Sequence, residues 1–133
     1  GYFKLKKVDG VRKELLHYKE KFNAEYMYFW ADTFLALPDK YFEEFAEMYK
    51  SEIGIPFWCQ TRPETLTVER VSLLKEMGIH RMGLGLEHGN ETFREKMLDR
   101  KIANSKIVDC LKILNTYDIK YSVNNPSFKP FLY

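Results

Sequence analysis

The sequence predicts an α/β fold built on a parallel sheet of about four strands, with helices on its outer face. Apolar runs of strand length alternate with segments of helical apolar spacing, and this alternation favours right-handed βαβ crossovers. Three of the runs end in a polar residue just before the next helix. The runs and their polar residues are Tyr26–Trp30 with Asp32, Ile55–Cys59 with Arg62, and Met82–Leu86 with Glu87. Parallel α/β proteins bind ligands at the carboxyl ends of their strands, so we expect these side chains to share one cofactor site.

A first helix is expected over 9–22, because its apolar residues recur at helical spacing and form one stripe. That stripe is Val11, Leu15, Tyr18 and Phe22. The five large residues of Tyr26–Trp30 follow. Such an unbroken apolar run suits a strand that is covered on both faces.

A second helix is expected to begin at Pro38 and Asp39, with Asp39 as its N-cap, and to end at Gly54. Its apolar residues again form one stripe. They are Phe42, Phe45, Ala46, Tyr49 and Ile53. The second strand, Ile55–Cys59, then carries its proline near the start, where a missing N–H is tolerated.

A third helix is expected between an N-cap at Thr67 and a terminal Gly78. Its inner face consists of Val68, Val71, Leu74 and Met77. The third strand, Met82–Leu86, is weakened by Gly83 and Gly85.

Asn90 and Asn104 are both suitable N-caps, so the next helical region is expected to break near 99–104. Its main part faces inward through Ile107, Cys110, Leu111 and Leu114. A fourth strand follows at Ile119–Val123. We therefore expect one domain over 1–125 and an irregular C-terminal tail over 126–133.

Composition narrows the functional class. The chain has 133 residues and 45% hydrophobic residues, enough for one packed core, and its net charge of +2 gives no evidence for nucleic-acid binding. A membrane-spanning stretch and a signal peptide are not evident, so a cytoplasmic location is expected. Cys59 and Cys110 are then expected to be buried free thiols. The three histidines share no metal-ligand spacing, and no metal site is expected.

The first two strand ends allow two interpretations each. Asp32, followed by Thr33, can accept hydrogen bonds from a ligand ammonium group, or it can stabilise a helix or turn. Arg62 can form a bidentate pair with a ligand carboxylate, or it can form a surface salt bridge with Glu64.

The third strand end carries an acidic residue after two glycines. The glycine spacing fails the dinucleotide-binding fingerprint, which requires glycine where His88 stands. Small residues such as Gly85 let a planar ligand approach the backbone, and Glu87 can then bind a ribose diol. The alternative is a structural carboxylate that caps the following helix.

At these residues the sequence resembles the radical SAM superfamily, particularly the branch whose members often carry a cobalamin-binding domain. The similarity extends from about Asp9 to Asn125 and rests on Tyr28–Phe34, Gln60–Glu64 and Met82–Gly89, with Lys75–Gly78 and Asp99–Lys101 between them. The resemblance implies part of a (β/α)6 barrel, S-adenosylmethionine as cofactor and a four-iron, four-sulfur cluster. It places Asp32 near the methionine amino group, Arg62 near the methionine carboxylate or the substrate, and Glu87 near the ribose.

The expected cofactor-binding set is therefore Asp32, Thr33, Arg62, Gly85, Glu87 and Asn124. No catalytic residue is assigned, because the substrate and the reaction cannot be read from this chain. Two departures stand out: no cysteine precedes Tyr26, where the cluster-binding triplet belongs, and Pro126–Pro130 replaces the glycine- and proline-containing segment expected after the fourth strand. In addition, Ala31 stands where the family usually has an acid.

We therefore expect an internal barrel fragment that binds S-adenosylmethionine and is inactive alone. The alternatives are a non-enzymatic α/β interaction domain and a small enzyme that uses Asp32, Arg62 and Glu87 for acid–base chemistry. A sheet edge and an inner face left uncovered favour self-association.

Overall fold

The computed structural model describes residues 4–124 and confirms a parallel four-stranded sheet with helices on one face. The expected tail at 126–133 lies outside these residues. The helices are α1 (Val8–Phe22), α2 (Asp39–Met48), the π-helical turn η1 (Tyr49–Ile53), the 3₁₀ turn η2 (Pro63–Thr65), α3 (Val68–Met77), α4 (Glu91–Leu98) and α5 (Asn104–Thr116). The strands are β1 (Met27–Phe29), β2 (Phe57–Thr61), β3 (Ile79–Gly85) and β4 (Lys120–Asn124).

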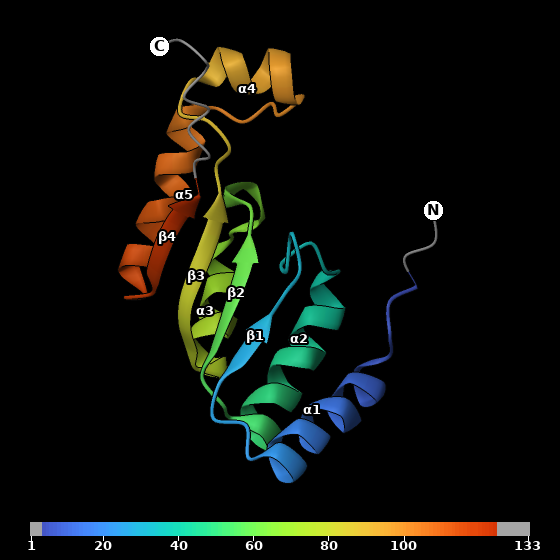
Figure 1. The fold of residues 1–133 in the computed structure, drawn as a ribbon. Helices are drawn as coiled ribbons and strands as arrows, with labels where there is room; N and C mark the ends of the chain where they lie inside the picture. Colours follow the sequence, from blue (N-terminus) through green and yellow to red (C-terminus); the bar gives the residue numbers. More distant parts are fainter. Residues whose placement is uncertain (1–3, 125–133) are drawn as a thin grey trace, which may run out of the picture.

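The strands lie in the order β1-β2-β3-β4, and each neighbouring pair is parallel. Helices α2, α3 and α5 cover the same face of the sheet, as right-handed crossovers require (Figure 1). Helix α1 lies beside the amino-terminal ends of the strands, and α4 lies beyond their carboxyl ends. All four carboxyl ends therefore open towards the same edge of the molecule.

The hydrophobic core fills the space between the sheet and the three covering helices. Alternate strand residues point into it because successive side chains of a strand face opposite sides. Its buried members include Met27, Phe57, Cys59, Met82 and Leu84 from the strands, and Phe45, Tyr49, Val71, Leu74 and Leu114 from the helices. Complete burial of each such side chain stabilises the fold by about 1.5–3 kcal/mol. The buried hydroxyl of Tyr49 donates to the carbonyl of Ile55 at 2.6 Å, which satisfies its polar atom.

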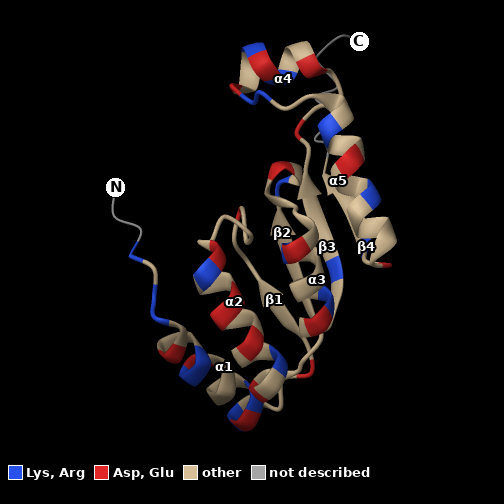
Figure 2. Ribbon diagram, turned by 180° about the vertical axis from the view of Figure 1, so that it is seen from behind, with Lys and Arg blue, Asp and Glu red and all other residues tan. Residues whose placement is uncertain are grey.

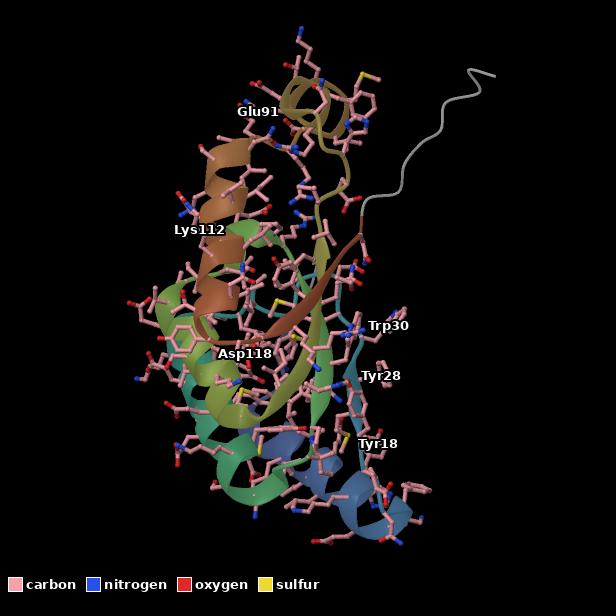
Figure 3. The ribbon with its side chains drawn as sticks, turned by 90° about the vertical axis from the view of Figure 1, so that its left-hand side faces the viewer. Tyr18, Tyr28, Trp30, Glu91, Lys112 and Asp118 are labelled. Carbon is pink, nitrogen blue, oxygen red and sulfur yellow. The ribbon has the colours of Figure 1, made fainter. Side chains whose placement is uncertain are left out.

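The other face of the sheet is open in the described residues, and this corrects the expectation for the first strand. Tyr28 is 69% exposed and Trp30 is 86% exposed, and both point away from α3 and α5 (Figure 3). The apolar run is continuous because Met27 and Phe29 face the core while Tyr28 and Trp30 face outward. Tyr28 of β1 and Trp58 of β2 are register partners in the sheet.

The helix ends test the expected caps. The Thr67 side chain accepts a hydrogen bond from the N–H of Arg70 at 3.2 Å, which confirms it as the N-cap of α3. Gly54 and Gly78 end their helices with φ of 63° and 86°, a left-handed conformation that suits glycine. Asp39 was wrong as a cap, because Pro38 takes that position. Its carboxylate instead accepts two hydrogen bonds from Arg70, at 3.0 and 2.7 Å.

Three residues expected to face the core are exposed instead. Tyr18 and Phe22 lie on α1, which packs mainly against α2 and η1 and buries Val8 and Leu15. Val68 is the first residue of α3, and this end of the helix lies outside the core. None of the described helices has the length and hydrophobicity needed to cross a membrane.

Candidate functional site

The expected site residues lie at one edge of the sheet because they follow adjacent parallel strands. Asp32 lies in the turn after β1, Arg62 follows β2, Glu87 follows β3, and Asn124 is the last residue of β4. Neighbouring strands are about 4.8 Å apart, so the four positions form a rim at the carboxyl edge (Figure 1). Charged residues of both signs occur along α1, α2 and α3, so none of these three helices carries charges of one sign alone (Figure 2).

The turn after β1 is fixed to β2 by its backbone. The N–H of Phe34 donates to the carbonyl of Gln60 at 2.8 Å, and the N–H of Leu35 donates to the Thr61 hydroxyl at 3.3 Å. Asp32 itself is exposed, and α2 begins only at Asp39, so the carboxylate does not cap that helix. These contacts hold the carboxylate at the rim on a rigid turn.

Asp32 and Thr33 face different cavities. Asp32 lines a small pocket of about 120 Å³ together with Trp30, Ala31, Trp58 and Gln60. Thr33 instead lines an apolar cavity of about 200 Å³ between β1 and α2. The Thr33 carbonyl accepts a hydrogen bond from the N–H of Ala36 at 3.1 Å, so this residue shapes the turn.

Arg62 is exposed and makes no ion pair with any other residue of the described range. The expected alternative, a salt bridge with Glu64, is contradicted, because both Glu64 oxygens accept hydrogen bonds from Arg100 at 2.9 Å. The Arg62 carbonyl accepts from the Thr65 hydroxyl at 2.7 Å, which fixes the backbone. The guanidinium of Arg62 is therefore available to a ligand.

Glu87 has φ of 72°, a left-handed conformation that is rare for a residue with a side chain. The N–H groups of Leu86 and Glu87 both donate to the Asn124 carbonyl, at 3.2 and 3.3 Å, and hold the end of β3 against β4. The Glu87 side chain is 43% exposed. Glu87 does not cap α4, because the Asn90 side chain accepts from the N–H of Phe93 at 2.9 Å and serves as that cap.

Gly83 and Gly85 have separate steric roles. A Cβ at Gly83 would lie 2.8 Å from Cζ2 of Trp58, so the glycine lets the indole lie against β3. A Cβ at Gly85 would lie 3.2 Å from Oε1 of Glu87. The space beside Gly85 is thus taken up by the Glu87 carboxylate in this structure.

Arg100 is a rim residue that the sequence reasoning did not assign to the site. Its side chain is only 9% exposed. Besides the bidentate pair with Glu64, its Nη1 donates to the Gly85 carbonyl at 2.8 Å and lies 3.7 Å from Oε1 of Glu87. Arg100 therefore joins the ends of β2 and β3. The signal for it lay in the Asp99–Lys101 segment, but its partners are distant in sequence.

The buried Arg94 fixes α4 above the rim. Its Nη1 donates to the His88 carbonyl at 2.6 Å, and its Nη2 donates to the Ile102 carbonyl at 2.9 Å and to the Asn104 side chain. Asn104 was wrong as an N-cap: Ala103 takes that position, and the Asn104 side chain serves as an acceptor for Arg94. The segment after Glu87 is thereby held in place by one cation.

The cysteines of the chain do not fit a rim cluster. Cys59 faces the core from β2 and Cys110 lies buried on α5. Burial raises the pKa of the Cys59 thiol to about 12 and also raises the pKa of Cys110. Within residues 4–124, no three His, Cys, Asp or Glu side chains gather in a metal-binding arrangement.

These features define a class: a parallel α/β barrel segment that presents charged groups of both signs at the carboxyl ends of its strands. The radical SAM superfamily model matches residues 1–128, and the chain belongs to that superfamily. The family predicted from the sequence is thereby confirmed.

Solved structures with a similar fold include three of the cobalamin-dependent S-adenosylmethionine radical enzyme OxsB. The form with aqua-cobalamin and the form with aqua-cobalamin and S-adenosylmethionine each match 87% of this chain at 19% identity, with TM-scores of 0.71 and 0.72. The apo form matches 92% at 19% identity and a TM-score of 0.72. This chain covers 19–20% of the length of those chains. No curated protein matches.

Proposed function

We propose that this chain forms part of the S-adenosylmethionine site of a radical SAM barrel. The observation that carries the proposal is the row of charged side chains at adjacent strand ends: an exposed carboxylate at Asp32, an exposed guanidinium at Arg62 and a half-buried carboxylate at Glu87. An amino-acid zwitterion joined to a ribose needs partners of these kinds. One OxsB structure that shares the fold holds S-adenosylmethionine.

Each residue has a distinct role in this proposal. Asp32 accepts hydrogen bonds from the methionine ammonium, and Arg62 donates a bidentate pair to the methionine carboxylate. Glu87 accepts from the ribose hydroxyls, as an acid after a parallel strand does in other nucleotide sites.

The other members of the set shape the rim. Gly85 admits the Glu87 carboxylate beside the backbone, and Thr33 shapes the turn that carries Asp32. Asn124 holds the β3 end through its carbonyl, and its exposed side chain offers a further polar contact.

The family also implies a four-iron, four-sulfur cluster, which supplies the electron that cleaves S-adenosylmethionine. The two cysteines of this chain do not fit it, because both are buried in the core with raised pKa values. We propose that residues 1–133 alone bind S-adenosylmethionine weakly and do not cleave it.

Isothermal titration calorimetry with S-adenosylmethionine tests this function. We expect a dissociation constant of about 1 mM, near −4 kcal/mol, because a bound metal does not anchor the amino acid moiety. Glu87→Ala is expected to abolish the heat signal, while the control Glu95→Ala, an exposed carboxylate on α4, leaves it unchanged. Micromolar binding that is indifferent to Glu87 would contradict the proposal.

A second candidate is a non-enzymatic interaction domain. The observation in its favour is the open sheet face, where Tyr28 and Trp30 expose large aromatic surfaces. A chain with this function alone would show no S-adenosylmethionine heat in the same titration, with or without the Glu87 change.

A further inference from the structure

The two tryptophans of the chain lie side by side at the rim. Trp30 follows β1 and Trp58 lies in β2, and their ring centroids are 5.9 Å apart with the planes inclined by 32°. Trp30 is the most exposed large apolar residue of the described range, at 86%. An indole with this exposure can stack against a bound ligand.

The position of Trp58 depends on the neighbouring strand. Gln60 and Gly83 are register partners, and the Trp58 indole leans over Gly83, where a Cβ would lie 2.8 Å from Cζ2. Any larger residue at Gly83 would displace the ring. The glycine therefore lets this indole lie flat along the sheet beside the pocket.

A carboxylate completes this pocket. Asp32 lines the pocket of about 120 Å³ with Trp30, Trp58, Ala31 and Gln60. This is room for about four water molecules, at about 30 Å³ each, and thus for a small ligand group rather than a whole nucleoside. We call these five residues the aromatic–carboxylate pocket.

The pocket lacks an internal cation in the part of the chain that the structure describes. Asp32 forms no ion pair there, and neither indole has a Lys or Arg over its ring. Arg81 is the register partner of Trp58 on β3 but makes no such contact. Two electron-rich rings and one unpaired carboxylate are complementary to a weakly hydrated organic cation.

We propose that the aromatic–carboxylate pocket binds an onium group, and that this group is the sulfonium of S-adenosylmethionine. The identity of the cation rests on the function proposed above. A sulfonium carries a permanent charge on a compact apolar group, which suits the faces of Trp30 and Trp58. Asp32, the acceptor for the methionine ammonium in the proposed function, also offsets part of the sulfonium charge. The same pocket binds a neutral thioether less tightly, so it favours S-adenosylmethionine over S-adenosylhomocysteine.

A minimal probe tests the pocket independently of nucleoside recognition. Trimethylsulfonium chloride is titrated into the chain while tryptophan fluorescence is recorded, and both reporters lie in the pocket because the chain has only two tryptophans. We expect saturable quenching that sodium chloride at equal ionic strength and neutral tert-butanol do not produce. Asp32→Asn is expected to weaken the binding about fivefold to tenfold.

Selectivity between the two nucleosides gives the second test. The ratio of S-adenosylmethionine to S-adenosylhomocysteine affinity is measured by calorimetry for Trp30→Leu and Trp58→Leu, with circular dichroism as a check of folding. Each change is expected to lower the ratio about fivefold or more. Phe22→Leu, which changes an exposed aromatic residue of α1 outside the pocket, leaves the ratio unchanged.

The outcomes separate the two proposals. Quenching by trimethylsulfonium without S-adenosylmethionine binding supports an onium pocket and overturns the proposed function. Glu87-dependent S-adenosylmethionine binding with a ratio that is indifferent to both tryptophans overturns the onium pocket and leaves the function intact. Equal quenching by tert-butanol and trimethylsulfonium also overturns the onium pocket, because the pocket would then bind apolar groups regardless of their charge.

Discussion

The Arg100 side chain links the segment that follows β2 to the end of β3. It donates to both Glu64 oxygens at 2.9 Å and to the Gly85 carbonyl at 2.8 Å, and it is almost fully buried. Removal of a buried cation leaves its acceptors without partners, which is the costly way to break such a network. The ends of β2 and β3 therefore depend on this one guanidinium.

We predict that Arg100→Leu lowers the free energy of unfolding by about 2–3 kcal/mol. Urea denaturation followed by circular dichroism measures it. Arg81→Leu, which removes an exposed arginine from β3, is the matched control and is expected to change stability by less than about 0.5 kcal/mol. Equal losses of unfolding free energy in the two variants would contradict a stabilising role for the buried contacts of Arg100.

Cys59 gives stability a dependence on alkaline pH. Burial raises the pKa of its thiol to about 12 in the folded chain, against about 8.5 in the unfolded chain. The unfolded state thus loses its proton first, so the stabilisation is complete below about pH 8.5 and is lost as the pH rises towards 12. Between these pH values the free energy of unfolding falls by up to about 1.4 kcal/mol per pH unit.

The prediction is tested by urea denaturation at pH 8 and pH 10 on the wild type and on Cys59→Val. The wild type is expected to lose about 1–2 kcal/mol more than the variant between these values, because valine does not ionise. A Cys59 thiol that reacts with a disulfide reagent in the native state at pH 8, as fast as in urea, would contradict the burial on which this rests.

Among the elements, β3 shows how a glycine can be required by a neighbour. We predict that Gly83→Ala changes the near-ultraviolet circular dichroism of tryptophan and destabilises the fold by about 1–3 kcal/mol, because its Cβ meets the Trp58 ring at 2.8 Å. Gly10→Ala is the control. No atom lies within 4 Å of a Cβ there, inside α1, so this change is expected to stabilise by about 0.5–1 kcal/mol.

Local sequence signals predicted the elements well where the cause was local. Thr67, Asn90, Gly54 and Gly78 form the helix ends that their types indicate, because each acts on the backbone a few residues away. Asn104 was mispredicted because its side chain is engaged by Arg94, a residue on another helix.

The edge positions of the candidate site residues were predictable to the same extent. The positions of Asp32, Arg62 and Glu87 at one edge follow from strand periodicity and parallel order. The role of Arg100 did not follow, since its partner Glu64 is 36 positions away. The separate cavity of Thr33 also depends on how the turn after β1 packs against α2, which periodicity does not specify.

In the described residues, the sheet has one face covered by helices and one open face. Tyr28 and Trp30 are exposed on the open face, and β1 pairs only with β2 there. Exposed aromatic surface and a free strand edge both favour association. We predict that light scattering shows a mass that rises with protein concentration, and that Trp30→Lys reduces the effect. A constant monomer mass over a wide concentration range would contradict it.

We propose that the carboxyl ends of the four strands form the S-adenosylmethionine site. The most direct measurement is the change in ¹H–¹⁵N chemical shifts as S-adenosylmethionine is titrated to millimolar concentration, which is practicable for 133 residues. We predict the largest shifts at residues 31–34, 60–64 and 85–89, and none around Gly78 and Asp118 at the opposite edge. Shifts confined to that opposite edge, or spread evenly over the helices, would contradict the claim.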